Sequence, residues 1–318
     1  MGVVAFLHAK GAPGTTTTAL LAAALWPGPV LLVDADADGG DVALRLRRRD
    51  GAPVDRTRGL LSLLPLARRE LQAETVPEHA QELSGGIEAV AGLSGPGQAG
   101  AAGHLWSNLA DAFGRTVDRD VLVDCGRVSP QSSHLPLLQR ADLVVCVLRP
   151  TVSGVVHTRE RLAALQSSLV GPDGHRPRVG LVLVSDRPAG RDADGAAGVI
   201  ERDLPGVEVL GRLAYDVKGA AVFEGFATSR PERTLLVRSG RDVVAALVEA
   251  LRHETRHAAP GQDPGPEQAR EQAPEQAPEQ AEPTEGDAAA APVPDEATAR
   301  PAPRSSRRRA LARRGAAS

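Results

Sequence analysis

Two hydrophobic patterns alternate along most of this chain. Short, almost continuous apolar runs predict strands at residues 3–8, 29–36, 86–93, 120–126, 141–150, 179–186 and 207–214. Longer segments with apolar residues at helical spacing predict helices at residues 16–25, 101–114, 152–169, 194–203 and 235–253. The segment between the third strand and the second helix, "SGPGQAG", is expected to be a flexible loop.

The alternation of strands and helices predicts an α/β fold, with a mostly parallel sheet and helices on both faces. In such sheets, ligands bind beyond the carboxyl ends of the strands. Three polar segments follow predicted strands directly: "HAKGAPG", "DADADGGD" and "DCGRV". We therefore expect the fold to bring these three loops together at one crevice.

The composition changes near residue 258. From there the chain repeats Pro, Glu, Gln and Ala, which offer few side chains able to offset the entropy of ordering a backbone. This change predicts a folded domain at 1–257 and a disordered tail at 258–318. The tail has ten acids between Asp263 and Glu296, then seven arginines between Arg300 and Arg314.

Charge and cysteine content indicate the compartment and the class of partner. Residues 1–257 carry 29 Lys and Arg against 30 Asp and Glu, which gives no general attraction to nucleic acid. The arginine-rich end alone is expected to contact DNA or an anionic membrane weakly, through charge. Cys125 and Cys146 are not spaced as a metal or redox pair, and we expect both to be buried and reduced. We find no signal peptide and no stretch of about 20 apolar residues, so we predict a cytoplasmic protein, associated through its tail with the nucleoid or the inner membrane surface.

The loop after the first strand has the outline of a phosphate-binding loop. Gly11, Gly14 and the start of the following helix would expose backbone N–H groups, and Thr16 stands where a hydroxyl would bind Mg²⁺. However, Gly14 is followed by Thr15, where the phosphate-binding motif has a lysine. Taken alone, the loop is equally consistent with a simple glycine-rich turn.

The other two loops contribute carboxylates. Asp34 and Asp36 flank Ala35 at the end of the second strand, and Asp124 ends a four-residue apolar run. Carboxylates held at strand ends suit a hydrated Mg²⁺ ion. Gly126 would leave room beside a terminal phosphate.

The order and spacing of four segments resemble the ParA/MinD family of deviant Walker-A ATPases, over residues 1 to about 255. These segments are "KGAPGTTTTALLAAAL", "VLLVDADADGGDVALRL", "DVLVDCG" and "ADLVVCVLRPTVSGVVHTRERLAAL". The resemblance implies a P-loop NTPase-like fold, binding of ATP with Mg²⁺, and a homodimer. The nucleotide-binding loop would be Lys10, Gly11, Ala12, Pro13, Gly14, Thr15, Thr16 and Thr17.

The same resemblance assigns roles to single residues. Lys10 would be the signature lysine that reaches the partner subunit's phosphates; because the chain has only two lysines, a lysine at this position stands out. Thr16, Asp34 and Asp124 would hold or support the metal, and Asp36 would polarise the attacking water.

The chain also departs from the family pattern. Ala9 and Ala12 replace the first loop residue and a glycine, and Thr15 replaces the P-loop lysine. Losing a charge-assisted contact worth ~1.5–3 kcal/mol should weaken nucleotide binding at least about tenfold. Near the expected base, Ser185 and Asp186 stand where the family often has an asparagine. Tyr215 and Asp216 fit either a base-bordering segment or a simple turn.

These observations predict a nucleotide-dependent dimerising switch that hydrolyses ATP slowly or not at all. It would act in intracellular positioning, in partitioning of chromosomes or plasmids, or in assembly of cellular machinery, with a protein partner or cargo that the sequence does not name. One alternative is a non-catalytic localisation scaffold that resembles TadZ or CpaE, which the loss of the P-loop lysine favours. A second is a DNA-associated protein that binds through its basic tail. The arginine-rich, lysine-poor composition indicates a bacterial source.

Overall fold

The computed structural model describes residues 1–186, 191–226 and 230–258. These residues belong to the first of two units into which the chain divides, residues 1–261. The tail predicted from residue 258 onward lies outside the described residues apart from its first position. Its disorder and its contacts with DNA or membranes therefore stay predictions.

The described part of the chain is built on an eight-stranded sheet, with the strand order β3-β4-β2-β5-β1-β6-β7-β8. Neighbouring strands are parallel, except that β3 runs antiparallel to β4. The strands are β1 (Val3–His8), β2 (Val30–Asp34), β3 (Gln81–Glu82), β4 (Glu88–Val90), β5 (Asp120–Arg127), β6 (Leu143–Leu148), β7 (Arg178–Ser185) and β8 (Val207–Ala214).

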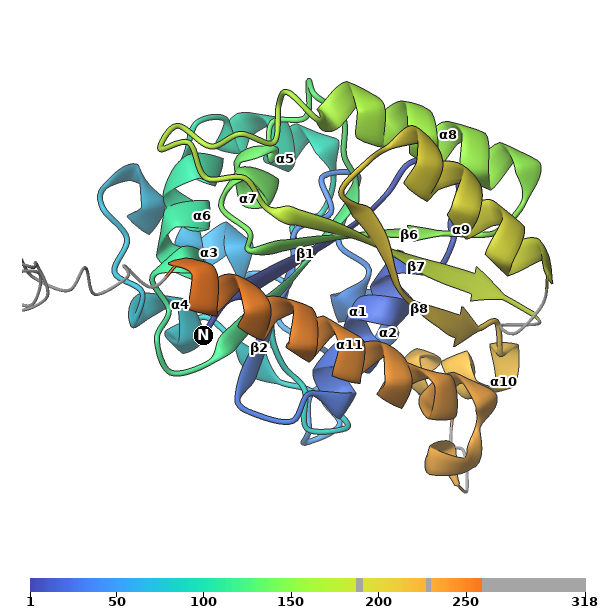
Figure 1. The fold of residues 1–318 in the computed structure, drawn as a ribbon. Helices are drawn as coiled ribbons and strands as arrows, with labels where there is room; N and C mark the ends of the chain where they lie inside the picture. Colours follow the sequence, from blue (N-terminus) through green and yellow to red (C-terminus); the bar gives the residue numbers. More distant parts are fainter. Residues whose placement is uncertain (187–190, 227–229, 259–318) are drawn as a thin grey trace, which may run out of the picture. The chain divides into compact units, whose positions relative to one another are not determined.

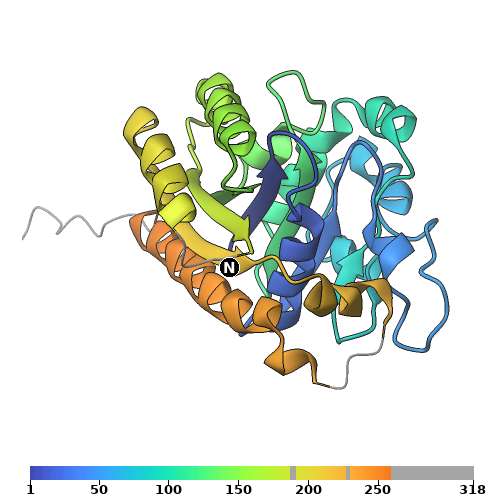
Figure 2. The ribbon, with the colours of Figure 1, turned by 90° about the vertical axis from the view of Figure 1, so that its right-hand side faces the viewer.

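Helices cover both faces of the sheet (Figures 1 and 2). Figure 1 shows α8 and α9 on one face, with α11 and α1 on the other. The helices are α1 (Thr15–Leu25), α2 (Val42–Arg45), α3 (Leu60–Leu63), α4 (Thr75–Glu78), α5 (Pro96–Ala102), α6 (Leu105–Gly114), α7 (Pro136–Gln139), α8 (Val152–Leu165), α9 (Arg191–Asp203), α10 (Val217–Ala220) and α11 (Leu235–Ala258). Three short 3₁₀ turns complete the elements: η1 (Leu66–Arg68), η2 (Ala221–Glu224) and η3 (Pro231–Arg233).

The core explains why the central strands are mostly apolar on both faces. Along β1, the side chains of Val3, Ala5 and Leu7 pack into the cluster on one face, whereas Val4 and Phe6 pack into the cluster on the other. Because both faces are covered by helices, neither set of alternating positions can be polar. The structure thus confirms the predicted α/β class with helices on both faces.

The structure corrects several predicted boundaries. The expected flexible loop at 94–100 contains the start of α5, which begins at Pro96, and the helix predicted at 101–114 is interrupted at Gly103, whose φ is 50°. Positive φ ends a helix readily at glycine, which has no Cβ to clash. The third predicted strand shortens to the three residues of β4.

The structure bears on two of the predictions, the state of the cysteines and the membrane-spanning segments. Cys125 in β5 and Cys146 in β6 are both buried and unbonded. None of the helices in the described ranges is both long enough and apolar enough to cross a membrane. The predicted localisation itself is not tested by these observations.

Candidate functional site

The loop between β1 and α1 has the backbone of a phosphate cradle. Gly11 and Gly14 adopt φ values of 75° and 105°, which only glycine tolerates easily, and an added Cβ at either position would meet no atom within 4 Å. The carbonyl of Gly14 accepts hydrogen bonds from the N–H and the hydroxyl of Thr18, at 2.8 and 2.9 Å. The N–H groups of the first turn of α1 therefore face an open loop, where an anion is favoured.

Thr15 lies in the first turn of α1 and points away from that open loop. Its side chain is buried, and its Oγ1 shares a hydrogen bond of 3.1 Å with Nδ1 of His8. Burial, together with the nearby positive charge of Arg127, lowers the pKa of His8, so the imidazole is neutral at pH 7. The position of the usual phosphate-binding lysine is thus occupied by a buried threonine paired with a neutral, partly buried histidine.

The metal-side carboxylates come from adjacent parallel strands. Asp34 ends β2 and lies directly beside Asp124 of β5 in the sheet register. Both side chains are buried, at 1% and 0% exposure. Burial and the charge of Asp124 raise the pKa of Asp34 to about 8. Burial raises the pKa of Asp124 to about 6, against the opposing effect of the Thr16 side chain and the Gly126 N–H.

Each of these two carboxylates keeps one oxygen without a partner. Asp34 accepts the Val42 N–H at 3.0 Å and Asp124 accepts the Gly126 N–H at 3.1 Å. Among the described residues, Oδ1 of Asp34 and Oδ2 of Asp124 have no partner with hydrogen-bond geometry, although the Thr16 side chain is near enough to favour ionised Asp124. Buried unpartnered carboxylate oxygens are rare in folded proteins and indicate a missing cation or donor.

A Mg²⁺ ion fits this arrangement only if a bound phosphate and waters supply further oxygen ligands. The described residues contain no group of three His, Cys, Asp or Glu side chains placed to hold a metal alone. However, Mg²⁺ is usually bound by one or two carboxylates, waters and the oxygens of a bound phosphate. Asp124, Asp34 and the Thr16 hydroxyl suit that mode, with the phosphates completing the coordination.

Glycines make room for the carboxylates. A Cβ on Gly40 or Gly92 would lie 2.5 or 2.8 Å from the carboxyl group of Asp34, and a Cβ on Gly126 would lie 2.1 Å from that of Asp36. Asp36 also accepts the N–H of Asp38 at 2.8 Å, and burial raises its pKa. The carboxylate of Asp36 therefore lies directly over the backbone of Gly126, near the carboxyl end of β5. The three predicted loops do lie together at the carboxyl edge of the sheet.

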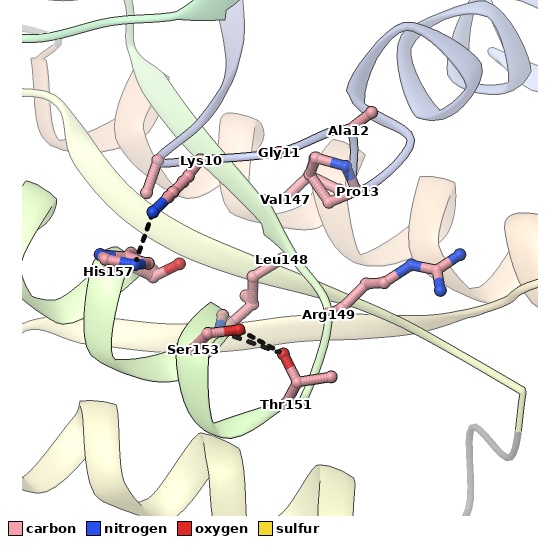
Figure 3. Close-up of a pocket in the computed structure, with 13 residues that line it drawn as sticks. Lys10, Gly11, Ala12, Pro13, Val147, Leu148, Arg149, Thr151, Ser153 and His157 are labelled. Carbon is pink, nitrogen blue, oxygen red and sulfur yellow. Dashed lines mark hydrogen bonds between the residues drawn. The ribbon is translucent and has the colours of Figure 1, made fainter. Parts of the chain in front are cut away.

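Lys10 lies on one side of the phosphate loop, in a cavity of about 310 Å³ between that loop and the start of α8 (Figure 3). Its side chain is exposed, and its Nζ donates to Nε2 of His157 at 3.3 Å. The other ring nitrogen of His157 lies 3.7 Å from Glu160, which favours the tautomer that accepts from Lys10. The Lys10 ammonium is therefore directed toward α8.

A second cavity, of about 370 Å³, lies on the other side of the loop. Its walls are mostly apolar and include Pro13, Thr17, Tyr215 and Leu236. Such a cavity beside a phosphate cradle has the shape and polarity for a nucleobase or another flat apolar group.

Of the four predicted base-end residues, Asp216 and Tyr215 make structural contacts. Asp216 caps two helices, because its carboxylate accepts the N–H of Gly219 in α10 and of Leu235 in α11. The ring of Tyr215 lies beneath the guanidinium of Arg149, 3.8 Å from its centroid. Ser185 has an enclosed hydroxyl without a partner among the described residues, and Asp186 is exposed.

The sequence analysis missed the cations around the loop. Arg45, in the four-residue helix α2, donates to Thr17 at 3.0 Å and to Glu224 at 2.6 Å. Arg127, beside the same loop region, pairs with the exposed Asp38 at 3.2 Å. The many arginines of this chain hide the few that lie at the site, and no motif marks them.

No protein-family model matches the chain, and no curated protein sequence matches it significantly. Solved structures do match. A ParA family ATPase from Chlorobium tepidum TLS aligns with a TM-score of 0.60 at 19% identity, covering 77% of this chain and 98% of that chain. The MinC:MinD cell division complex of Aquifex aeolicus gives 0.57 at 17%, covering 78% and 96%. A Cyanothece McdA variant in complex with ATP gives 0.59 at 16%, covering 79% and 96%.

The structural alignments establish a shared fold, but sequence identities this low do not establish a shared activity. The alignments span almost the whole of each neighbour, so the similarity is to a complete domain and not to a shared fragment. The described part of the chain has the α/β fold of the ParA and MinD ATPases, with a mostly parallel eight-stranded sheet between two layers of helices.

Proposed function

We propose that this protein binds ATP with Mg²⁺ at the carboxyl edge of its sheet and acts as a nucleotide-dependent dimerising switch. The observation that carries the proposal is the buried pair Asp34 and Asp124, each with an unpartnered oxygen, beside Thr16 at the start of the phosphate cradle. Burial raises the pKa of both acids, and the charge of Asp124 raises that of Asp34 further, so keeping the two ionised opposes folding. A bound cation would remove that cost.

Each part of the nucleotide would have a place in this geometry. The phosphates would lie on the N–H groups between Gly11 and Thr16, and the base would enter the apolar cavity beside Thr17. Bound Mg²⁺ would neutralise phosphate charge, held by Thr16, Asp124 and Asp34. Asp36, over Gly126, would orient a water near the terminal phosphate.

Hydrolysis would be slow, because no lysine charge stabilises the phosphates from position 15. Lys10 would act on a partner subunit's phosphates, since it points away from its own loop. In such a switch, ATP favours the dimer and the hydrolysis rate sets its lifetime. Positioning, partitioning and assembly remain the proposed settings, in line with the ParA, MinD and McdA proteins that share the fold.

The alternative is a scaffold that has the fold without nucleotide, and Thr15 favours it. At the position of the usual lysine, Thr15 is hydrogen-bonded to the neutral His8, which suits a loop that serves only the fold. The buried acids argue against this alternative, because a scaffold gains nothing from keeping two unpaired carboxylates.

The deciding experiment is a calorimetric titration of the full chain with ATP and ADP, with and without Mg²⁺, followed by light scattering. We expect Mg²⁺-dependent binding and an ATP-dependent increase in mass. Asp124→Ala should lose the Mg²⁺ dependence, whereas Asp50→Ala, an exposed acid that pairs with Arg48, should keep it. If neither nucleotide binds at millimolar concentration, the scaffold function stands instead.

A further inference from the structure

Arg45 lies against the phosphate loop although it is remote from it in the sequence. It ends α2, and its Nη2 donates to the Thr17 hydroxyl at 3.0 Å, 28 positions away. Its Nε donates to Glu224 at 2.6 Å, 179 positions away. The side chain is only 15% exposed. Its guanidinium is therefore fixed at the loop and not free in solvent.

Arg45 is the one cation among the described residues that line the cavity beside Thr17. Thr15 contributes no charge there, and Lys10 lies in the cavity on the opposite side of the loop. A charge at this place would act on an anion bound to the loop.

The guanidinium also has donors to spare. An arginine has five N–H donors, and the bonds to Glu224 and Thr17 use one from Nε and one from Nη2. In the described part of the chain, Nη1 has no hydrogen-bond partner. Arginine binds phosphate oxygens through paired N–H groups, so a guanidinium held by its Nε edge is already oriented for such a contact.

We propose that Arg45 binds a phosphate group of the nucleotide and supplies, from α2, the positive charge that the loop lacks at Thr15. Glu224 fixes the guanidinium by its Nε, and Thr17 holds it at the first turn of α1. The proposal rests on the nucleotide-binding function proposed above for the same site. In this arrangement, the positive charge that binds phosphate comes from Arg45 in α2 and not from a lysine at position 15, and phosphate binding is retained.

The test compares Arg45→Gln with Arg49→Gln. Glutamine removes the charge of residue 45 but keeps an amide donor for Thr17 or Glu224, whereas Arg49 pairs with Glu82 on the exposed surface. Isothermal titration with Mg²⁺-ATP and with ADP should show Arg45→Gln weakened roughly 10- to 150-fold, the loss of one charge-assisted contact. Arg49→Gln should bind as the wild type does. Thermal unfolding without nucleotide checks that both variants are folded.

A rescue separates a phosphate contact from a structural effect. Thr15→Lys restores a cation to the loop, so Arg45→Gln with Thr15→Lys should recover at least about tenfold of the lost affinity. If the wild type binds nucleotide and Arg45→Gln binds it with an affinity within threefold of the wild type's, Arg45 does not contact the phosphate. The proposed nucleotide site would still stand. Absence of binding in the wild type itself would overturn the nucleotide function, and this inference with it.

Discussion

Gly126 shows how one residue determines the position of another at the site. Its φ is 58°, and a Cβ there would lie 2.1 Å from the Asp36 carboxylate. Gly174 has a similarly positive φ of 84° with no atom within 4 Å of an added Cβ. An alanine at either position costs about 1–2 kcal/mol of backbone strain, but only the first also displaces a carboxylate.

The prediction for this pair concerns stability and turnover. We expect Gly126→Ala to lose at least about 1 kcal/mol more free energy of unfolding than Gly174→Ala, because Asp36 must shift. Urea denaturation measures the difference. Phosphate release from ATP should fall in Gly126→Ala and stay at the wild-type rate in Gly174→Ala. If both variants lose the same free energy of unfolding, the Asp36 carboxylate moves freely and is not held over Gly126.

The buried acid pair predicts how stability depends on pH. The pKa of Asp34 is about 8 in the folded protein and near 3.8 in the unfolded chain, so the folded state binds this proton more tightly. The favourable effect is complete below about pH 4 and is lost as pH rises through 8. In EDTA and without nucleotide, the protein should therefore become less stable between pH 5 and pH 8.

Asp34→Asn tests that dependence. Asparagine keeps an acceptor for the Val42 N–H but has no charge, so the variant should be more stable than the wild type at pH 8, by on the order of 1–3 kcal/mol, and similar to it at pH 4. Glu70→Gln, at an exposed acid, controls for the loss of one charge. The interpretation fails if the stabilisation of Asp34→Asn is the same at both pH values.

Among the elements, α1 and α11 pack closely at a glycine of α11, and this contact holds the helix that begins at the phosphate loop. A Cβ on Gly240 of α11 would lie 2.5 Å from the buried Leu21 side chain of α1. Gly198, on the exposed face of α9, has open space around it. These two glycines have the same helical backbone but opposite surroundings.

Alanine at these two positions should change stability in opposite directions. Gly198→Ala should stabilise by up to about 1 kcal/mol, because alanine favours helix, whereas Gly240→Ala should destabilise through overpacking by about 1–3 kcal/mol. Thermal and urea unfolding of the two variants give the comparison. A stabilised Gly240→Ala would mean that α1 and α11 separate easily, and that α11 does not fix the loop helix.

The elements differ in how far the sequence could predict them. The runs that became β1, β5 and β6 were predictable, because strands buried on both faces are apolar at most positions. The sequence also predicted that the loops with Asp34 and Asp124 would meet at one crevice. It did not predict that β2 and β5 are neighbours, which places these two residues side by side. In contrast, α2, α3 and α4 have four residues each, too few for a helical period to appear.

The unpredicted contacts at the site have a common cause. Arg45 reaches Thr17 and Glu224 only because α2 folds back over α1, and the intervening chain has no pattern that encodes this path. The pairing of Thr15 with His8 depends on a strand and a helix turning the two side chains toward each other. Sequence reasoning identified the acids of the site but not the positions of its cations.

On the scale of the whole molecule, the proposed switch needs a link between nucleotide and dimer, and Lys10 is the residue to test. Its side chain lies outside its own phosphate cradle and is held by His157. A lysine that acts only across an interface should matter for the dimer and not for binding by one subunit. The chain offers a matched control, because Lys218, its only other lysine, is exposed on α10.

We expect Lys10→Ala to bind Mg²⁺-ATP within about threefold of the wild type, since it removes no contact to the subunit's own phosphates. The same variant should remain monomeric in ATP, where the wild type and Lys218→Ala dimerise, because each subunit then lacks the charge that reaches its partner's nucleotide. Light scattering at several protein concentrations, beside calorimetric titration, measures both properties. A Lys10→Ala protein that dimerises normally but binds ATP tenfold more weakly would place Lys10 in its own subunit's site. The loop would then use its two flanking cations, Lys10 and Arg45, on the same nucleotide.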